Sequence, residues 1–456
     1  MSRRARRSPA PNETPQSGPE TDGPRDETPL VQTAEVTGRG PESTIEYQPV
    51  RIPLTRGLTS LRHRDFRLFW TGQLVSLVGT WMQIVAQSWL VLELTGSAFA
   101  LGVLSALQFV PTLAFSLLGG VVADRLPRRS LLLLTQTSAA LLALALAVLT
   151  ATGTVRFGHV MVLAALLGFV NALDMPTRQA FVVELVGPAD LRNAIALNSA
   201  AFNSARLVGP AVAGLAIGWI GIAGCFYVNA LSFLAVIAGL LLIHAGKRPA
   251  PRPSEPGSIW EDLREGLGYV ARTPLVRMVI VLVAIVGTFA MNMGVLMPLI
   301  ARDVLRVGAE GFGFLTSAMG VGSLVAAIVL AYQGQAVRPR LLFGAAVALG
   351  LLEVALALVR QFSVAVPVLA ATGFSMIFLT TLANTTLQVA TPDPLRGRVM
   401  SLYTTVFVGT TPLGSLFTGA LAEAWGVPAP LLVGGIVSVG AGLAGYRLSS
   451  RRRSTD

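Results

Sequence analysis

The sequence of 456 residues carries little charge: Asp, Glu, Lys and Arg make up 13% of it, whereas 53% of its residues are hydrophobic. Soluble domains carry roughly 25% charged residues, so most of this chain has no water to face. The length alone would suggest about three soluble domains, but the composition argues against them. It indicates a protein that crosses a membrane many times.

Residues that bind metals or perform covalent chemistry are also scarce. Cys225 is the single cysteine, and the three histidines lie far apart in the sequence. An intrachain disulfide and a cysteine-based metal site are therefore excluded. An HExxH box, a Walker A loop and a GxSxG elbow do not occur. We expect no enzyme, no catalytic residue, no metal and no cofactor.

The formal charge of +11 does not indicate a nucleic-acid partner, because of where the charges lie. Residues 1–50 hold six Arg against eight Asp and Glu, so the basic excess belongs to residues 51–456. There the Lys and Arg residues fall between apolar runs, which is a topology signal. Residues 1–55 have no apolar period and are rich in Pro, Glu and Thr, and we predict a disordered tail.

Long apolar runs alternate with short polar joints from residue 66 onward. The pattern predicts twelve transmembrane helices in an all-α fold, and the runs are 68–93, 98–123, 130–152, 157–177, 191–218, 223–244, 275–300, 311–333, 340–360, 363–386, 397–422 and 428–447. Weak similarity between the halves predicts two pseudo-symmetric six-helix bundles. The predicted parts are an N-terminal bundle at 56–245, a cytoplasmic linker with an amphipathic helix at 246–274, a C-terminal bundle at 275–447 and a basic tail at 448–456.

Lys and Arg residues are unequally divided between the two sets of joints. If both termini lie on one side of the membrane, that side holds 24 of them from residue 51 onward, and the other side holds four, namely Arg156, Arg302, Arg306 and Arg360. Cytoplasmic connections carry the excess of Lys and Arg in membrane proteins. The bias therefore predicts that both termini are cytoplasmic.

The joint between the second and third runs carries one aspartate and three arginines, which are costly at a membrane surface unless they pair. Its spacing resembles the loop motif of the major facilitator superfamily, with Pro127 where that motif usually has a glycine. The resemblance implies a cytoplasmic latch between the two halves. The alternative is a basic loop that only sets the topology. The residues of this candidate latch are Gly120, Asp124, Arg125, Arg128 and Arg129.

The fifth run contains Arg206, the residue whose burial in a membrane costs the most free energy in this chain. Arg206 lies about 18 Å from the end of this run at 1.5 Å per residue, near the bilayer midplane. A guanidinium at that depth needs a carboxylate, carbonyl oxygens or a water-filled cavity. Asn203 shares its helical face, so this face must look inward. A role in binding or gating and a structural pair within the same half both remain open.

The same run carries a Gly-Pro motif formed by Gly209, Pro210 and Gly214. Small residues permit close contact between helices, and the proline weakens the helix locally. The pattern is similar to the motif that major facilitator exporters of the antiporter type carry in the fifth helix. This similarity implies an interface motif between the two halves, with ordinary small-residue packing as the alternative.

Polar residues at helical spacing recur in several runs, and facing lipid would leave them without hydrogen bonds. We expect them to line a central cavity between the first, fourth, seventh and tenth runs. The candidate cavity residues are Gln83, Gln87, Asn171, Asn203, Arg206, Asn292, Thr381 and Asn384.

Charged residues also occur near or within two other runs. Asp174 and Arg178, on one face at the end of the fourth run, are candidates for a cytoplasmic gate, with a local helix cap as the alternative. Glu353 interrupts the apolar ninth run and is either protonated or paired inward. Its role is left open.

Several stretches together resemble one branch of the major facilitator superfamily, and they lie at 64–70, 93–97, 174–181 and 193–199. The branch is the drug:proton antiporter group with macrolide efflux pumps and the enterobactin exporter, also called the transmembrane secretion effector family. The resemblance covers residues 55–447 and implies export across a bacterial inner membrane, driven by protons. One departure is that residues 161–173 lack the basic residue that many proton-coupled exporters carry in the fourth helix.

We therefore predict a secondary active transporter that exports a drug, a siderophore or another lipophilic metabolite by alternating access, in exchange for protons. Its expected partners are a small-molecule substrate, protons and the lipid bilayer, and we expect a monomer that binds no nucleic acid. The alternatives are proton-coupled uptake of a small solute and a non-transporting receptor or assembly protein on the same fold. Short outer joints argue against a receptor.

Overall fold

The computed structural model describes residues 30–37, 44–51, 54–243, 259–333 and 339–451. The chain forms two compact units, Met1–Gly57 and Leu58–Asp456. The first unit contains a two-stranded hairpin and the second contains the transmembrane helices.

The hairpin pairs β1 (Leu30–Thr37) with β2 (Thr44–Arg51) in an antiparallel register. Both strands lie within residues 1–55, where the sequence predicts a disordered tail, and each contains Val and Thr, which favour strands. The rest of that prediction, at 1–29, 38–43 and 52–53, lies outside the described residues.

The second unit is helical throughout its described part, and the short 3₁₀ helix η1 (Leu54–Arg62) begins before its first residue, Leu58. Its elements are α1 (Arg64–Thr95), α2 (Ala98–Arg125), α3 (Arg128–Ala151), α4 (Phe157–Leu242), α5 (Ile259–Arg272), α6 (Pro274–Phe289), α7 (Met293–Leu299), the π-helical η2 (Ile300–Val304), α8 (Ala309–Gln333), α9 (Pro339–Leu358), α10 (Phe362–Ala390), α11 (Asp393–Trp425) and α12 (Pro428–Arg451).

Helix α4 is three transmembrane segments in sequence. Gly187 (φ 71°) and Gly221 (φ 72°) interrupt its 86 residues with backbone conformations that glycine adopts without strain. Among the described residues, ten helical stretches are long and apolar enough to cross a membrane, and α6, α7 and η2 together form one of them. Because α4 supplies three segments, the predicted twelve transmembrane helices are confirmed.

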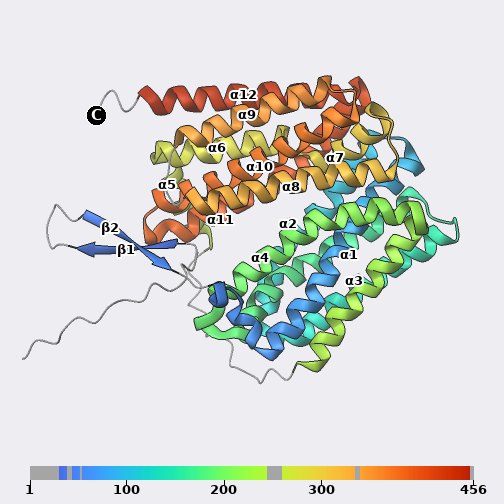
Figure 1. Cartoon of the computed structure of the whole chain (residues 1–456), viewed down its shortest axis with the longest axis horizontal. Helices are drawn as coiled ribbons and strands as arrows, with labels where there is room; N and C mark the ends of the chain where they lie inside the picture. The colour runs from blue at the N-terminus through green and yellow to red at the C-terminus, as the bar shows by residue number, and fades with distance from the viewer. Residues whose placement is uncertain (1–29, 38–43, 52–53, 244–258, 334–338, 452–456) are drawn as a thin grey trace, which may run out of the picture. The chain divides into compact units, whose positions relative to one another are not determined.

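The helices form two bundles within this unit (Figure 1). In the N-terminal bundle α1, α2 and α3 pack on α4, and in the C-terminal bundle α12 packs on α9 and α10 packs on α8. We call the end with the connections at 126–127, 391–392 and before α5 the linker end. The opposite end, with the connections at 96–97, 305–308 and 426–427, is the distal end. The ribbons of the two bundles converge at the distal end and diverge toward the linker end (Figure 1).

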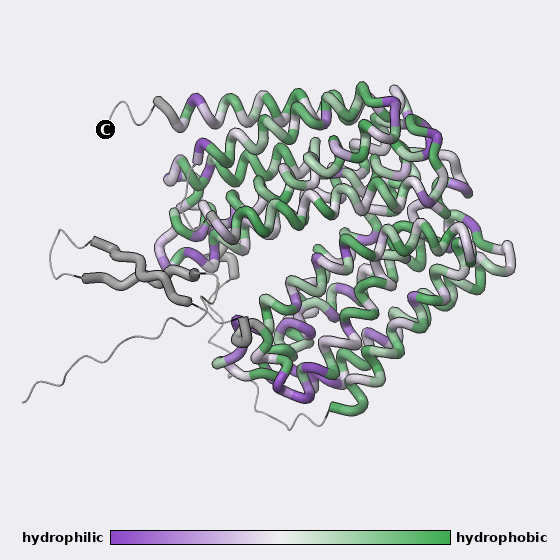
Figure 2. Tube along the Cα trace, viewed as in Figure 1, coloured by the Kyte–Doolittle hydropathy of each residue, from purple (hydrophilic) through white to green (hydrophobic). Residues whose placement is uncertain are grey.

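The surface of the helices is apolar, as a bilayer requires. Figure 2 shows hydrophobic residues along most of each helix and hydrophilic ones gathered near helix ends. Many leucines, valines and phenylalanines are exposed, and Trp219, Trp425 and Tyr332 are exposed near helix ends, where amphipathic aromatic rings favour the membrane interface. This surface faces lipid, so the chain is a multi-pass membrane protein.

The predicted amphipathic helix of the linker is α5, which is attached to the C-terminal bundle. The Tyr269 hydroxyl donates to the Ala390 carbonyl at 2.9 Å, and Glu265 pairs with Arg398. The linker residues 246–258 lie outside the described part of the chain. At the C-terminus α12 continues to Arg451, four residues into the predicted basic tail.

Within the C-terminal bundle, α8 and α10 approach so closely that only glycine fits. A Cβ on Gly322 would lie 1.7 Å from the Ala370 carbonyl oxygen, and one on Gly373 would lie 2.0 Å from the Met319 carbonyl oxygen. Backbone atoms cannot move aside as a side chain can, and small residues are what allow such contact in membranes.

We expect Gly322→Ala to lower the free energy of unfolding by about 1–3 kcal/mol through overpacking. Gly344→Ala on α9 is the matched control, since nothing lies within 4 Å of its Cβ position. That change should be neutral or stabilise the helix by up to about 1 kcal/mol. Thermal unfolding of both purified variants in detergent measures the difference, and equal melting temperatures would contradict the close approach.

Candidate functional site

Glycines bring the two bundles together in the distal half of the molecule. A Cβ on Gly102 of α2 would lie 2.5 Å from the Ser415 carbonyl oxygen of α11, and one on Gly313 of α8 would lie 2.5 Å from the Pro210 carbonyl oxygen of α4. The Ser317 hydroxyl of α8 also donates to the Leu207 carbonyl at 3.1 Å. The bundles are therefore closed against each other at this end.

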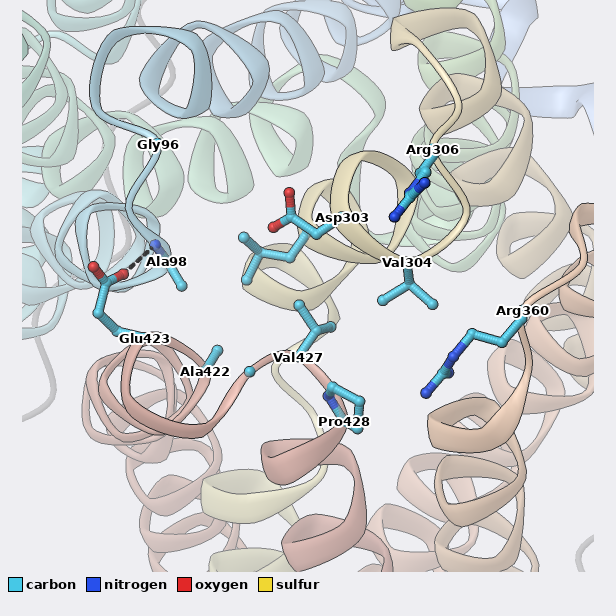
Figure 3. A pocket seen from close by; sticks show the side chains of 12 residues that line it. Gly96, Ala98, Asp303, Val304, Arg306, Arg360, Ala422, Glu423, Val427 and Pro428 are labelled. Atoms are coloured by element: carbon cyan, nitrogen blue, oxygen red, sulfur yellow. Dashed lines mark hydrogen bonds between the residues drawn. The ribbon is translucent and has the colours of Figure 1, made fainter.

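A carboxylate of α11 binds the first turn of α2 at this closure. Glu423 Oε2 accepts hydrogen bonds from the Ser97 hydroxyl at 3.0 Å and from the backbone amides of Ala98 at 2.6 Å and Phe99 at 3.2 Å. Figure 3 shows Glu423 reaching across to Ala98. The first amides of a helix have no partner within it and attract negative charge, so Glu423 links the bundles through a helix end.

A guanidinium of the C-terminal bundle binds the carbonyl oxygens at the end of α1, as the carboxylate of Glu423 binds the amides at the start of α2. Arg302 donates to the carbonyl oxygens of Leu92 and Gly96, both at 3.1 Å, and is held by Asp303 with Nε to Oδ1 at 2.6 Å. The last carbonyls of a helix attract positive charge. We call Glu423 and Arg302 the distal latch. The sequence did not predict this latch, because both residues lie in joints between apolar runs, where charged residues are common.

A cavity of about 340 Å³ lies between the bundles near mid-membrane. Both bundles contribute to its wall, and the side chains are mainly apolar, with several methionines and few polar groups. The lining includes Trp81, Ser88, Gln108, Phe109, Arg206, Met291, Asn292, Met293, Met297, Phe312, Thr316, Met319 and Met376. Methionines adapt to varied apolar ligands, and no carboxylate is present in this lining.

Arg206 is the one charged residue of the cavity wall. Its guanidinium carbon lies 5.9 Å from the centre of the Trp81 ring, a cation–π contact. Within the described part of the chain it has no ion pair or hydrogen bond to another side chain. A guanidinium has five donors, so Arg206 brings to the cavity wall a positive charge whose donors are not engaged by another side chain of the described residues.

The other candidate cavity residues lie in several environments. Asn292 lines the cavity and donates to the Thr288 carbonyl at 2.7 Å. Gln83 is buried and accepts a hydrogen bond from Asn229 at 2.6 Å within the N-terminal bundle. Gln87 is also buried. The remaining four are not part of this cavity wall and are half-buried or exposed, namely Asn171, Asn203, Thr381 and Asn384.

The candidate latch loop is tied to its own bundle. Arg128 is buried and pairs with Glu184 of α4, with Nη1 to Oε1 at 2.5 Å, while its contact with exposed Asp124 is 3.6 Å. Arg129 donates to the carbonyl oxygens of Leu240 at 2.6 Å and Leu241 at 2.9 Å, at the end of α4. At the surface of α2, Arg125 is exposed and Gly120 is half-buried. Asp124 lies exposed in the last turn of α2, at the linker end.

Asp174 lies at the centre of a buried network rather than in a simple pair. It accepts hydrogen bonds from Thr135 at 2.8 Å, from Gln136 at 2.7 Å and from Arg178 Nε at 2.9 Å. All four residues belong to α3 and α4, so the network joins two helices of one bundle. Such a network satisfies a carboxylate inside a membrane protein.

The Gly-Pro motif faces two different neighbours. A Cβ on Gly209 would lie 2.5 Å from Trp81 Cβ of α1, within the N-terminal bundle. Gly214 and Pro210 meet α8 of the other bundle, where a Cβ on Gly214 would lie 3.0 Å from the Glu310 carbonyl oxygen. The motif thus lies at the contact between the bundles and directly beside Arg206.

The chain matches the model of a known protein family over most of its length. The model for the transmembrane secretion effector family of the major facilitator superfamily matches residues 55–455. The chain belongs to this family. The transmembrane secretion effector family consists of transporters, so the chain is a membrane transporter of small molecules and not an enzyme.

Individual relatives and solved structures agree with this assignment. The multidrug efflux pump Tap of Mycolicibacterium fortuitum is 28% identical over 84% of the chain and 97% of its own length. The enterobactin exporter EntS of Escherichia coli is 26% identical over 79% of the chain and 85% of its own length. The nucleoside transporter NupG has the same fold, with a TM-score of 0.68 at 10% identity over 84% of the chain and 98% of its own.

We expect removal of the distal latch to open the distal end. Each helix-end interaction contributes about 1 kcal/mol, so Arg302→Ala with Glu423→Ala should change the ratio of closed to open molecules roughly thirtyfold. Spin labels at Leu94→Cys and Trp425→Cys, in a Cys225→Ser background, report the distance across this end. Arg156→Ala serves as a control at the same end, and an unchanged distance distribution in the double variant would contradict the latch.

Proposed function

We propose that the chain exports lipophilic small molecules, neutral or anionic, from the cytoplasm across a bacterial inner membrane by alternating access in exchange for protons. The observation that carries this proposal is the guanidinium of Arg206, which has no ion pair among the described residues, in a mainly apolar cavity between two bundles. One chain holds the whole cavity, so a monomer suffices.

The orientation follows from the positive-inside rule. The linker end carries Arg125, Arg128, Arg129, Arg396 and Arg398, whereas the distal end carries the smaller set of basic residues. The linker end is therefore cytoplasmic in this proposal. With the distal end closed by glycine contacts and by the latch, the conformation described above is the one that loads cargo from the cytoplasm.

The chemistry of the wall selects the cargo. Trp81, Phe109, Phe312 and the methionines favour apolar surfaces, and Arg206 favours an anionic or hydrogen-bond-accepting group. A carboxylate that would attract an organic cation is absent from the lining. The names of two relatives, the enterobactin exporter EntS and a staphyloferrin A transporter of Staphylococcus aureus, support siderophores as one class of cargo.

The rocking step exchanges one set of contacts for another. Opening the distal end breaks the hydrogen bonds of Glu423 and Arg302 to the helix ends of α1 and α2. Closing the linker end brings the exposed Asp124 and Arg125 toward the C-terminal bundle, where they act as a cytoplasmic latch. Two ion pairs within the N-terminal bundle, Arg128 with Glu184 and Asp174 with Arg178, keep this bundle rigid during the movement.

Replacing Arg206 tests the function at its central residue. In proteoliposomes we expect Arg206→Gln to reduce transport of 8-anilinonaphthalene-1-sulfonate, a lipophilic anion, roughly tenfold or more, because a charge-assisted hydrogen bond worth about 1.5–3 kcal/mol is lost. Arg206→Lys should retain part of the activity. Transport of the cation ethidium should not decrease, because no attraction is removed.

The matched control is Arg156→Gln, which removes an arginine from a joint at the distal end. Membrane abundance of all variants is compared by immunoblot, so that failure to insert is separated from failure to transport. Wild-type anion transport by Arg206→Gln at equal abundance would remove Arg206 from cargo recognition.

A further inference from the structure

The most isolated ionisable group of the helical unit is the carboxyl of Glu353 in α9. Its side chain is 1% exposed, and both carboxyl oxygens lack a hydrogen-bond partner among the described residues. It lies five residues before the end of α9, about 8 Å below the distal surface at 1.5 Å per residue. An unpaired carboxylate is not tolerated at such a place, whereas a protonated carboxyl is.

No cation compensates Glu353 from the helices packed around it. Helix α10 has no ionisable residue, and apart from Glu353 itself the charged groups of α6, α9 and α12 lie toward the linker end. There Arg340 stacks on Tyr446, with the guanidinium carbon 5.9 Å from the ring centre. Arg360, beyond the distal end of α9, donates instead to the carbonyl oxygens of Ala357 and Val359.

One backbone carbonyl oxygen is placed to accept a hydrogen bond from the protonated carboxyl of Glu353. A Cβ on Gly434 of α12 would lie 2.8 Å from Glu353 Oε2 and 2.3 Å from the Phe289 carbonyl oxygen, so the two oxygens are neighbours across this glycine. Helix α6 ends at Phe289, and the last carbonyls of a helix have no partner within it. Two facing acceptors repel each other unless one carries a hydrogen.

We propose that Glu353 is the proton-binding residue of the transporter and that its protonated carboxyl donates to the Phe289 carbonyl. The proposal rests on the proton exchange given under the proposed function. It assigns the proton to a site in the ninth transmembrane helix, outside the cavity wall.

The position of Phe289 connects this proton to the cargo. The seventh transmembrane helix is broken between α6 and α7, and two of the three residues of the break, Met291 and Asn292, line the cavity together with Met293 at the start of α7. When Glu353 loses its proton, its carboxylate repels the Phe289 carbonyl, and the break moves. Binding of cargo at the same break then favours release of the proton.

The distal surface supplies the route by which the proton enters. A pocket of about 670 Å³ opens there beside Arg360 and Pro428, which follow α9 and begin α12 (Figure 3). Buried Leu356 and Leu431 lie one turn closer to this pocket than Glu353 and Gly434 on the same helices. They separate Glu353 from the pocket in the closed conformation, and opening of the distal end exposes it.

The experiment compares the full-length wild type with Glu353→Gln in liposomes, with 8-anilinonaphthalene-1-sulfonate as the probe. Accumulation driven by a pH gradient and exchange without a gradient are measured on the same preparations. We expect Glu353→Gln to lose gradient-driven accumulation and to keep exchange, because its amide is always neutral and still donates to the Phe289 carbonyl. The control Asp393→Asn, on an aspartate that is 84% exposed, should keep both activities.

The outcomes separate this proposal from the one before it. Full gradient-driven accumulation by Glu353→Gln would overturn the role of Glu353 and leave proton exchange intact. A wild-type protein that exchanges the probe but ignores the gradient would overturn proton exchange and the role of Glu353 together. Infrared spectra need no probe: we expect the C=O stretch of a protonated carboxyl in the wild type and its loss in Glu353→Gln, and its persistence there would also overturn the assignment.

Discussion

The hydrocarbon interior of the bilayer provides no hydrogen-bond partner, and this constraint decides where each polar group of the chain lies. Asp174 is buried but accepts hydrogen bonds from three residues of two helices. Gln83 is paired with Asn229. Arg206 has no hydrogen bond or ion pair to another side chain of the described residues, so its charge requires a cavity that admits water or an anionic ligand. In the proposed function this guanidinium, which lines the cavity between the bundles, recognises the cargo.

Helix ends supply the second organising interaction. The distal closure binds charged side chains of one bundle to helix termini of the other, with Glu423 on the amides of α2 and Arg302 on the carbonyls of α1. Such contacts have direction and are broken by a small tilt, whereas the glycine contacts beside them provide close packing without polarity. In the proposed alternating access, these contacts are broken and re-formed in each cycle.

The fold was predictable from sequence to a larger extent than the site. Apolar runs and the joints between them identified all twelve segments, because a bilayer imposes the length of each. A charged side chain inside a membrane costs free energy, so Arg206 within an apolar run was recognisable as unusual. It lies in the cavity wall. Glu423, Arg302 and Glu184 could not be recognised, because their partners are helix ends or residues distant in sequence.

The central claim is that the cavity around Arg206 opens to the two sides of the membrane in turn. Ser88→Cys, a nearly isosteric change in the cavity wall, can be combined with Cys225→Ser and exposed to a membrane-impermeant thiol reagent from each side. Alternating access predicts labelling from the cytoplasmic side in the conformation described here, and labelling from the opposite side once the distal end opens. A cysteine that neither side reaches under any condition, or that both sides reach at once, would contradict it.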